Sequence, residues 1–247
     1  MHRAQNRLVR PWRTMNSALE YSGTELEAMS FALNYHRWIR DEFRPYLGET
    51  VAEVGAGVGD FSRLMLEAGV ERLYAFEPAG NLFPSLADSL DGAPGVTLFN
   101  AMFRVERLPA PVDSIVYVNV MEHIEDDEAE VQAAREALKP GGHLLIFVPA
   151  LRWLYSKADK ELGHFRRYRK NELRGLVEKA GFKVRQVRYF DIAGIIPWYV
   201  YFVLMRRSIG KSPVSLYDRI VVPVMRPIER LMKPPIGKNL LLVARKP

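Results

Sequence analysis

The chain has 247 residues, 48% of them hydrophobic and 26% charged, which excludes a disordered or low-complexity protein. It contains no cysteine, which excludes a disulfide framework, a thiolate zinc site and a cysteine nucleophile. Residues 1–150 hold 13 Lys/Arg against 22 Asp/Glu and residues 151–247 hold 22 against 7, so the two parts carry −9 and +15. The basic C-terminal part predicts an anionic partner, such as phosphate groups, lipid headgroups or nucleic acid.

One or two helices are predicted over residues 25–46, where apolar residues recur at mostly helical spacing, and residues 1–48 are interpreted as an N-terminal helical cap. From residue 50 onward, short apolar runs alternate with helical stretches. The predicted strands are 50–54, 72–76, 96–100, 113–118, 143–148, 183–189 and 240–243. The predicted helices are 59–68, 82–90, 127–138 and 171–180. This alternation indicates a largely parallel sheet covered on both faces.

The pattern divides the chain into a core at residues 49–190, an insertion at 191–238 and a final strand of the core at 239–247. The most apolar part of the insertion, residues 193–205, has thirteen residues, whereas a membrane-spanning helix needs about 20. Three interpretations remain open. The segment is a plain buried helix, a helix in a bilayer interface with Trp198 and its neighbouring tyrosines at headgroup level, or a lid over an apolar substrate.

A glycine-rich turn follows the first predicted strand. The sequence VAEVGAGVGDFSRL places Gly55, Gly57 and Gly59 at alternate positions, where backbone can approach a nucleotide ligand closely. A dinucleotide fingerprint needs glycine where this chain has Asp60, so a pyrophosphate ligand is disfavoured. Glu77 ends the second strand, about 20 residues beyond the turn, where a carboxylate can accept hydrogen bonds from a ribose. Close packing of strand on helix is the alternative explanation of the glycines.

At these residues the chain resembles the class I S-adenosylmethionine-dependent methyltransferases. The matching segments are EVGAGVG, FEP, DSIVYVNVMEHIEDD and LKPGGHLLIFVPA. The stretch LYSKADKELGHFRRY resembles a bacterial subgroup with a GH-x-RRY segment after strand five. The resemblance implies an α/β, Rossmann-like fold with a seven-stranded, mostly parallel sheet, an antiparallel last strand and S-adenosylmethionine as cofactor.

The resemblance also assigns residues to the cofactor. The turn residues and Glu53 would surround its methionine part, and Glu77 would hold the ribose. Pro78, next to Glu77, is also assigned to the cofactor site. Residues after strand three would lie near the adenine, and others would close or cap the pocket. These further residues are Asn100, Ala101, Met102, Asn119, Tyr35 and Trp38. For the last two, ordinary helix packing is the alternative.

Two histidines are candidates for a general base, which methyl transfer needs only if the acceptor must lose a proton. His123 follows strand four, and His164 lies in the segment expected to border the acceptor; a purely structural role is the alternative for each. The pattern Asn119-x-x-Glu122-His123 with a later His164 resembles the metal-binding E-x-x-E-H of small-RNA 2'-O-methyltransferases and some ubiquinone-pathway O-methyltransferases. Asn119 replaces the first acid, so we expect no tightly bound metal.

A basic cluster lies beside the expected pocket and predicts an anionic group on the acceptor; it consists of Arg166, Arg167, Tyr168 and Arg169. One or two of its arginines would pair with a phosphate or carboxylate through bidentate hydrogen bonds. The alternative is an exposed turn tied to Asp159, Glu161 and Glu172. The residues expected to contact the acceptor are Glu122, Arg166, Arg167, Tyr168 and Trp198.

These features predict a methyltransferase that acts on a small or lipid-like acceptor, with transfer to oxygen favoured. An RNA methyltransferase is an alternative that the +15 charge favours, but apolar and aromatic runs separate the arginines and no RNA-binding module is recognised, so nucleic acid is not an expected partner. A catalytically inactive cofactor-binding or membrane-peripheral protein is a second alternative. No apolar run of signal-peptide length follows the N-terminal arginines, so we expect a cytoplasmic protein, with association with the inner face of the membrane if the interface interpretation holds.

Overall fold

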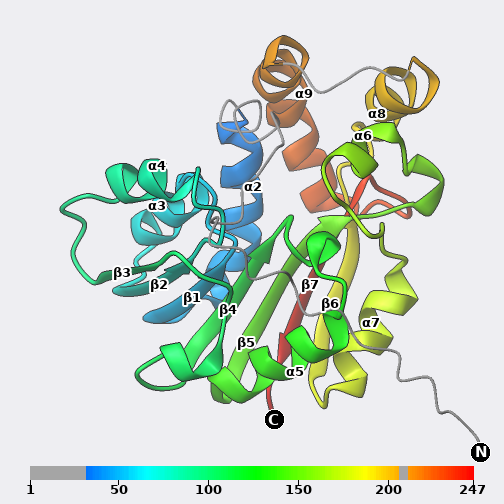
Figure 1. Ribbon diagram of the computed structural model, residues 1–247. Coiled ribbons are helices and arrows are strands. Elements are labelled where there is room, and N and C mark those ends of the chain that lie inside the picture. The colour runs from blue at the N-terminus through cyan, green and yellow to red at the C-terminus, as the bar shows by residue number, and fades with distance from the viewer. Residues whose placement is uncertain (1–31, 206–210) are drawn as a thin grey trace, which may run out of the picture.

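A seven-stranded sheet forms the centre of the protein (Figure 1). The computed structural model describes residues 32–205 and 211–247, so the part of the predicted cap that precedes residue 32 lies outside the described residues. β7 runs antiparallel to both of its neighbours, and every other adjacent pair is parallel. The predicted fold class is therefore confirmed. The strands, in order across the sheet, are β3 (Val96–Phe99), β2 (Arg72–Phe76), β1 (Thr50–Val54), β4 (Val112–Val118), β5 (Leu138–Pro149), β7 (Asn239–Arg245) and β6 (Lys183–Phe190).

Helices cover both faces of the sheet because its central strands are apolar on both sides. All five residues of β1 are buried, as expected for a parallel strand between two helical layers. In β4, Tyr117 belongs to one apolar cluster and Val116 to the other. One face packs against α5 (Asp127–Ala137) and α7 (Lys170–Lys179), and the other against α2 (Leu33–Phe43), α3 (Asp60–Glu67) and α4 (Phe83–Ser89). Shorter elements connect these: η1 (Arg44–Tyr46), η2 (Val105–Arg107), η3 (Met121–His123), η4 (Arg152–Leu154) and α6 (Lys157–Glu161).

The insertion contains a long helix that the sequence pattern did not predict, α9 (Lys211–Leu231). Two prolines lie inside it, where proline normally disfavours a helix. Contacts of α9 with α2 offset the cost of these prolines. The Asp218 carboxylate of α9 accepts hydrogen bonds from the backbone nitrogens of Asn34 and Tyr35, at 3.1 and 2.8 Å. Because α2 has no cap from its own N-cap side chain, Asp218 satisfies donors that the start of that helix would otherwise leave unpaired.

The apolar segment 193–205 forms α8 (Ile195–Trp198) and the π-helix η5 (Tyr199–Leu204). The side of this segment that carries Ile196 and Leu204 faces solvent, with these residues 72% and 66% exposed, so the interpretation as a plain buried helix is wrong. The reason is that other helices already cover the sheet, and the segment contributes to neither apolar cluster of the core. In the described part of the chain, no helix combines the length and the apolarity that crossing a bilayer requires.

Candidate functional site

The candidate site lies at the carboxyl ends of β1 and β4. These strands are neighbours, but the chain leaves them toward opposite edges of the sheet, and this arrangement opens a crevice where open α/β sheets bind ligands. The turn that follows β1 holds Gly55, Gly57 and Gly59 at φ angles of 73°, 58° and 89°. Residues with a side chain rarely adopt this left-handed conformation, so the path of the turn itself requires the glycines.

The turn also leaves no room for side chains. A Cβ atom on Gly55 would lie 2.5 Å from Cγ2 of Val120, and one on Gly59 would lie 2.8 Å from Oγ of Ser89. The Gly55 amide donates a hydrogen bond of 2.8 Å to the carbonyl of Phe76, which fastens the turn to the end of β2. A bare, rigidly held turn of this kind fits a cofactor that must approach the backbone closely.

Glu77, at the end of β2, is bonded directly to this turn. Its Oε2 accepts a 2.8 Å hydrogen bond from the Gly57 amide, and its Oε1 accepts one of 2.8 Å from the Ala79 amide. Burial raises the pKa of Glu77, although both backbone hydrogen bonds favour the carboxylate. A carboxylate oxygen can accept two hydrogen bonds, so both oxygens retain capacity for ribose hydroxyl groups. The glycine turn and the acid, inferred separately from the sequence, therefore form one unit.

Glu53 lies in β1 beneath the turn and is buried. Burial raises its pKa to about 8, although a hydrogen bond from the Ser62 hydroxyl group favours the ionised form. The folded protein thus holds Glu53 protonated at neutral pH. A neutral carboxyl group in this position acts as a hydrogen-bonding group and adds no negative charge to the crevice.

Replacing Glu53 with glutamine should flatten the pH dependence of stability. Because the pKa of Glu53 is raised from 4.5 to about 8 on folding, its contribution to the free energy of unfolding is complete below the ordinary pKa and is lost as pH rises through the folded-state value. Urea unfolding from about pH 5 to about pH 9 should therefore show a smaller loss of stability for Glu53→Gln than for wild type. Glu71→Gln, at an exposed position, should match wild type. A wild-type slope in the Glu53 variant would contradict the assignment.

The residues expected near the adenine form a more open edge. The Asn100 amide nitrogen donates a 2.9 Å hydrogen bond to the backbone carbonyl of Glu77, which leaves the side-chain oxygen as the atom that could accept from a base. Ala101 and Pro78 are half-buried and Met102 is exposed. These positions line the same edge, since β2 and β3 are parallel neighbours. Their contact with adenine stays a prediction.

Asn119 lies at the carboxyl end of β4, in the crevice. Its φ of 54° is a left-handed conformation that is uncommon for a residue with a side chain, although asparagine tolerates it better than most. The backbone N–H of Asn119 donates a 2.8 Å hydrogen bond to the backbone carbonyl of Phe147 in β5, which holds the turn. Such conformations persist where the surrounding structure enforces them, often at functional sites.

Tyr35 and Trp38, predicted to cap the cofactor, are buried in the core, where α2 packs on the sheet. The Tyr35 hydroxyl group lies 3.1 Å from Oδ2 of Asp191 and 3.1 Å from Oδ1 of Asn239. The Trp38 ring packs on the Phe190 ring, with the ring centroids 4.0 Å apart. These are the contacts of the packing alternative. A role in capping the cofactor stays a prediction.

The structure brings both candidate histidines together. They lie among the residues predicted to border the acceptor, a region called here the acceptor side. η3 follows β4, and the segment after α6 runs beside it, fastened by a 2.8 Å hydrogen bond from the Phe165 amide to the Glu122 carbonyl. The rings of His123 and His164 meet edge to face, with centroids 4.6 Å apart. Burial and the neighbouring His164 lower the pKa of His123 to about 4, so this imidazole is neutral at neutral pH.

Glu122, His123 and His164 could also hold a metal ion. Their ligand atoms all lie within 4.8 Å of one another. One carboxylate and two imidazoles would suit a divalent transition ion better than magnesium, which prefers oxygen ligands and bound water. The expectation that no metal is tightly bound, made from Asn119, stays a prediction.

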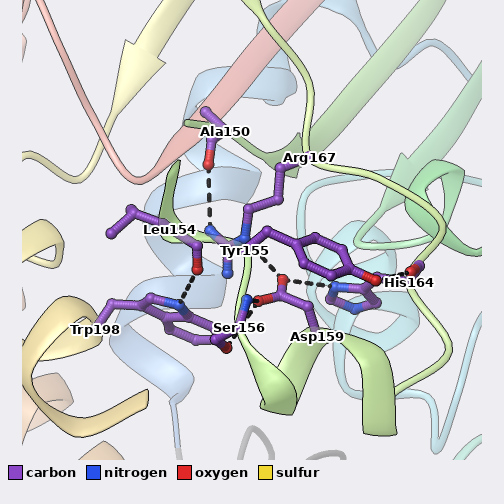
Figure 2. A network of polar contacts seen from close by, with 8 residues as sticks. All are labelled: Ala150, Leu154, Tyr155, Ser156, Asp159, His164, Arg167 and Trp198. Atoms are coloured by element: carbon purple, nitrogen blue, oxygen red, sulfur yellow. Dashed lines mark hydrogen bonds and ion pairs between the residues drawn. The ribbon is translucent and has the colours of Figure 1, made fainter. Parts of the chain in front are cut away.

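Arg167 is buried in a polar network that ties the acceptor side together (Figure 2). Its Nε donates a 2.7 Å hydrogen bond to Oδ1 of Asp159, and the same oxygen lies 3.0 Å from Nδ1 of His164. Its guanidinium group lies 4.6 Å from the ring centroid of Trp198, whose Nε1 donates to the Leu154 carbonyl at 3.2 Å. Arg167 is thus tied to Asp159 as the exposed-turn alternative expected, but it is buried, so the expected exposure is wrong for this residue. The pairing of Arg167 with an acceptor stays a prediction.

Two other members of the basic cluster, Arg166 and Tyr168, contact α5. Arg166 forms a 2.6 Å ion pair with Asp127, and the Tyr168 hydroxyl group lies 2.8 Å from the same carboxylate. Arg169, which is exposed, lies 3.9 Å from Glu172 as the exposed-turn alternative expected. The residue that sequence reasoning missed is thus Asp127, whereas Asp159 was expected only as a partner in an exposed turn. The available signals were helix caps: Ser156-x-x-Asp159 forms a capping box, and Asp127 lies in the first turn of α5.

A comparison with protein families matches residues 28–187, more than half of the chain, to a family described as a methyltransferase domain. A search of curated proteins found no match. Among solved structures, an S-adenosylmethionine-dependent methyltransferase from Mesorhizobium loti is 16% identical, with a TM-score of 0.55, covering 83% of this chain and 96% of its own. A cyclopropane synthase, MmaA2, from Mycobacterium tuberculosis is 16% identical, with a TM-score of 0.57, covering 84% of this chain and 82% of its own.

A third structure is phosphoethanolamine N-methyltransferase 2 from Haemonchus contortus in complex with S-adenosyl-L-methionine. It is 15% identical, with a TM-score of 0.62, and the match covers 95% of this chain and 58% of that one. At these identities the solved structures support the fold, whereas the family match covers the glycine turn, Glu77 and both histidines. The chain therefore belongs to the methyltransferase domain family, has the class I fold, and uses S-adenosylmethionine as its cofactor.

Proposed function

We propose that this methyltransferase transfers the methyl group to an oxygen atom of a small or lipid-like acceptor that carries an anionic group. The observation that carries the oxygen assignment is the contact between Asp159 and His164, with His123 beside them at the end of β4. A hydroxyl acceptor must lose a proton during transfer, and an oriented imidazole can accept it.

The chemistry of Asp159 defines which nitrogen of His164 is basic. Burial alone would raise the pKa of Asp159, but hydrogen bonds from His164 and Arg167 together hold it below the ordinary value. An ionised carboxylate can only accept, so Nδ1 of His164 donates to it and Nε2 carries the lone pair. In this arrangement Asp159 positions the ring and His164 removes the proton. His123, whose pKa of about 4 makes it a weak base, packs edge to face against His164.

When bound, S-adenosylmethionine supplies a methyl group on a positively charged sulfur. The residues of the chain have to align the acceptor and exclude water, since positioning alone can correspond to an effective molarity of about 10⁵ M or more. The glycine turn, Glu77 and Asn119 would hold the cofactor. Glu122, Arg166 and Trp198, together with the two histidines, would border the acceptor.

Two features support a lipid-like, anionic acceptor. Exposed apolar residues of α8 and η5 lie next to the acceptor side, because Trp198 touches Arg167. The C-terminal part of the chain, residues 151–247, carries +15. An acceptor with an apolar body and an anionic group matches both, and it would be met at the cytoplasmic face of a membrane.

Calorimetry with S-adenosylmethionine and S-adenosylhomocysteine tests the cofactor site. Wild type should bind both compounds, and Glu77→Gln should weaken binding by about 10-fold to 100-fold, because a hydrogen bond to a charged group contributes about 1.5–3 kcal/mol. Glu71→Gln, exposed and away from the turn, should bind as wild type does. Absence of heat with either compound would overturn the proposal.

Methyl transfer to candidate acceptors tests the chemistry. His164→Gln should lower kcat by about 10²-fold to 10⁴-fold with an unchanged Kd for the cofactor, because general base catalysis contributes that much. A methylated nitrogen or carbon atom in the product would contradict the oxygen assignment.

A further inference from the structure

Helix α9 is apolar on two opposite sides. Its inner side packs on the core through Val222 and on α2 through Asp218. Its outer side exposes a stripe of large apolar residues spaced three or four positions apart, so they lie on one face of the helix. These residues, called here the α9 stripe, are Leu216, Ile220, Val224, Ile228 and Leu231.

A second exposed apolar patch lies at the same end of the molecule. The α8–η5 patch consists of Ile196, Tyr199, Tyr201, Leu204 and Met205. Trp153, also exposed, meets Tyr199 edge to face with centroids 5.9 Å apart. Figure 1 shows that α8 and α9, although separate from each other, both lie at the end of the sheet where β4 and β5 have their carboxyl ends, which is the end that carries the candidate site. Aromatic residues that combine an apolar ring with a polar tip are typical of a membrane interface.

The charge of the insertion is separated between its inside and its outside. Residues 191–238 contain only three acids, and all three are buried. Asp218 caps α2, Glu229 accepts from the backbone nitrogens of Asp191 and Ile192, and Asp191 accepts from Gly194 and pairs with Lys238. The same segment contains eight Lys or Arg. The surface that the described residues of this segment present is therefore apolar and cationic, with no exposed carboxylate among them.

We infer that the α9 stripe and the α8–η5 patch together dock on a lipid bilayer that contains anionic lipids. Apolar and aromatic side chains would enter the interface, and the exposed cations Arg219 and Arg230 of α9, with Lys233 just after it, would contact lipid phosphates. A bilayer supplies the apolar phase and the negative charge at one surface, which matches this combination. The inference deepens the proposed function, since a lipid-like acceptor would be met there.

The buried contacts explain how docking would orient the site. Asp218 and Glu229 fasten α9 to α2 and to the end of β6, and Trp198 links α8 to Arg167 on the acceptor side. These links are made inside the protein, so the outer side can be changed without removing them. Docking would thus place the acceptor side at the membrane.

Vesicle flotation without cofactor tests the inference. Wild type should bind vesicles of phosphatidylcholine with about one-third phosphatidylglycerol at low salt, and binding to phosphatidylcholine alone, or at high salt, should be at least about fivefold weaker. The double variant Ile220→Ser/Val224→Ser should lower the partition coefficient at least about tenfold, because both side chains leave the apolar phase. Arg219→Gln/Arg230→Gln should lower it on anionic vesicles only.

The matched control is Lys183→Gln/Arg185→Gln, which removes two exposed cations from β6 and should leave binding unchanged. Each variant should keep the melting temperature and the cofactor affinity of wild type, which shows that loss of vesicle binding is not unfolding. No binding to anionic vesicles at low salt would overturn the inference, as would a solution dimer that Ile220→Ser/Val224→Ser dissociates. Vesicle binding is measured without cofactor, and cofactor binding is measured in solution. A failure of the docking inference is therefore distinguishable from a failure of the proposed function.

Discussion

Gly55→Ala should lower the affinity for S-adenosylmethionine by more than about tenfold and destabilise the folded protein. The substitution combines two costs. A residue with a side chain is strained at the φ of 73°, by about 1–3 kcal/mol, and the new Cβ would lie 2.5 Å from Cγ2 of Val120. The turn must shift to relieve the contact, and it would then lose its hydrogen bonds to β2 and its fit to the cofactor. Calorimetry and urea unfolding measure the two effects.

Gly92→Ala is the matched control. Gly92 also has a left-handed φ, of 68°, but among the described residues no neighbouring atom lies within 4 Å of the position that a Cβ would take. It should show the backbone strain without a change in cofactor affinity. Gly55→Ala/Val120→Ala should recover part of the stability, since it removes the atoms that the new methyl group meets. Wild-type affinity in Gly55→Ala would contradict the assignment of this turn to the cofactor.

Among the proposed variants, Asp159→Asn should lower the free energy of unfolding the most, by about 3–5 kcal/mol, because it leaves the Arg167 charge buried without its counterion. Both side chains are almost fully buried, at 0% and 1% exposed, and the pair is supported by hydrogen bonds from Ser156. Glu161→Gln in the same helix breaks an exposed pair with Lys157 and should cost less than about 1 kcal/mol. Urea unfolding measures both.

Replacing both partners separates the buried charge from packing. Asp159→Leu/Arg167→Met should be more stable than Asp159→Leu alone, because the double change removes the charge that the single change strands. Equal stability of the two would show that the charge of Arg167 is not the source of the loss. The double variant should also lose methyl transfer, since His164 would no longer have the carboxylate that positions its ring.

The predicted strands and the glycine turn correspond closely to the structure because their signals are local. A buried parallel strand is a short apolar run, and the turn after β1 needs glycine for its own backbone path, whatever packs against it. Glu77 could be found because it ends the second predicted strand, about 20 residues beyond the turn. Its hydrogen bond to Gly57, however, depends on two strands lying side by side.

The sequence by itself determined the α/β core and the position of the glycine turn and Glu77 at the end of the sheet. Tertiary structure decided which charges are buried and which apolar faces stay exposed. Asp159 and Arg167 look like members of a solvated, charged stretch, but chain packing encloses them, and Asp218 caps a helix that begins 185 residues earlier. The outer face of α9 looks like a core face by its spacing alone. Burial is set by what packs against a segment from distant parts of the chain, and local sequence does not contain that information.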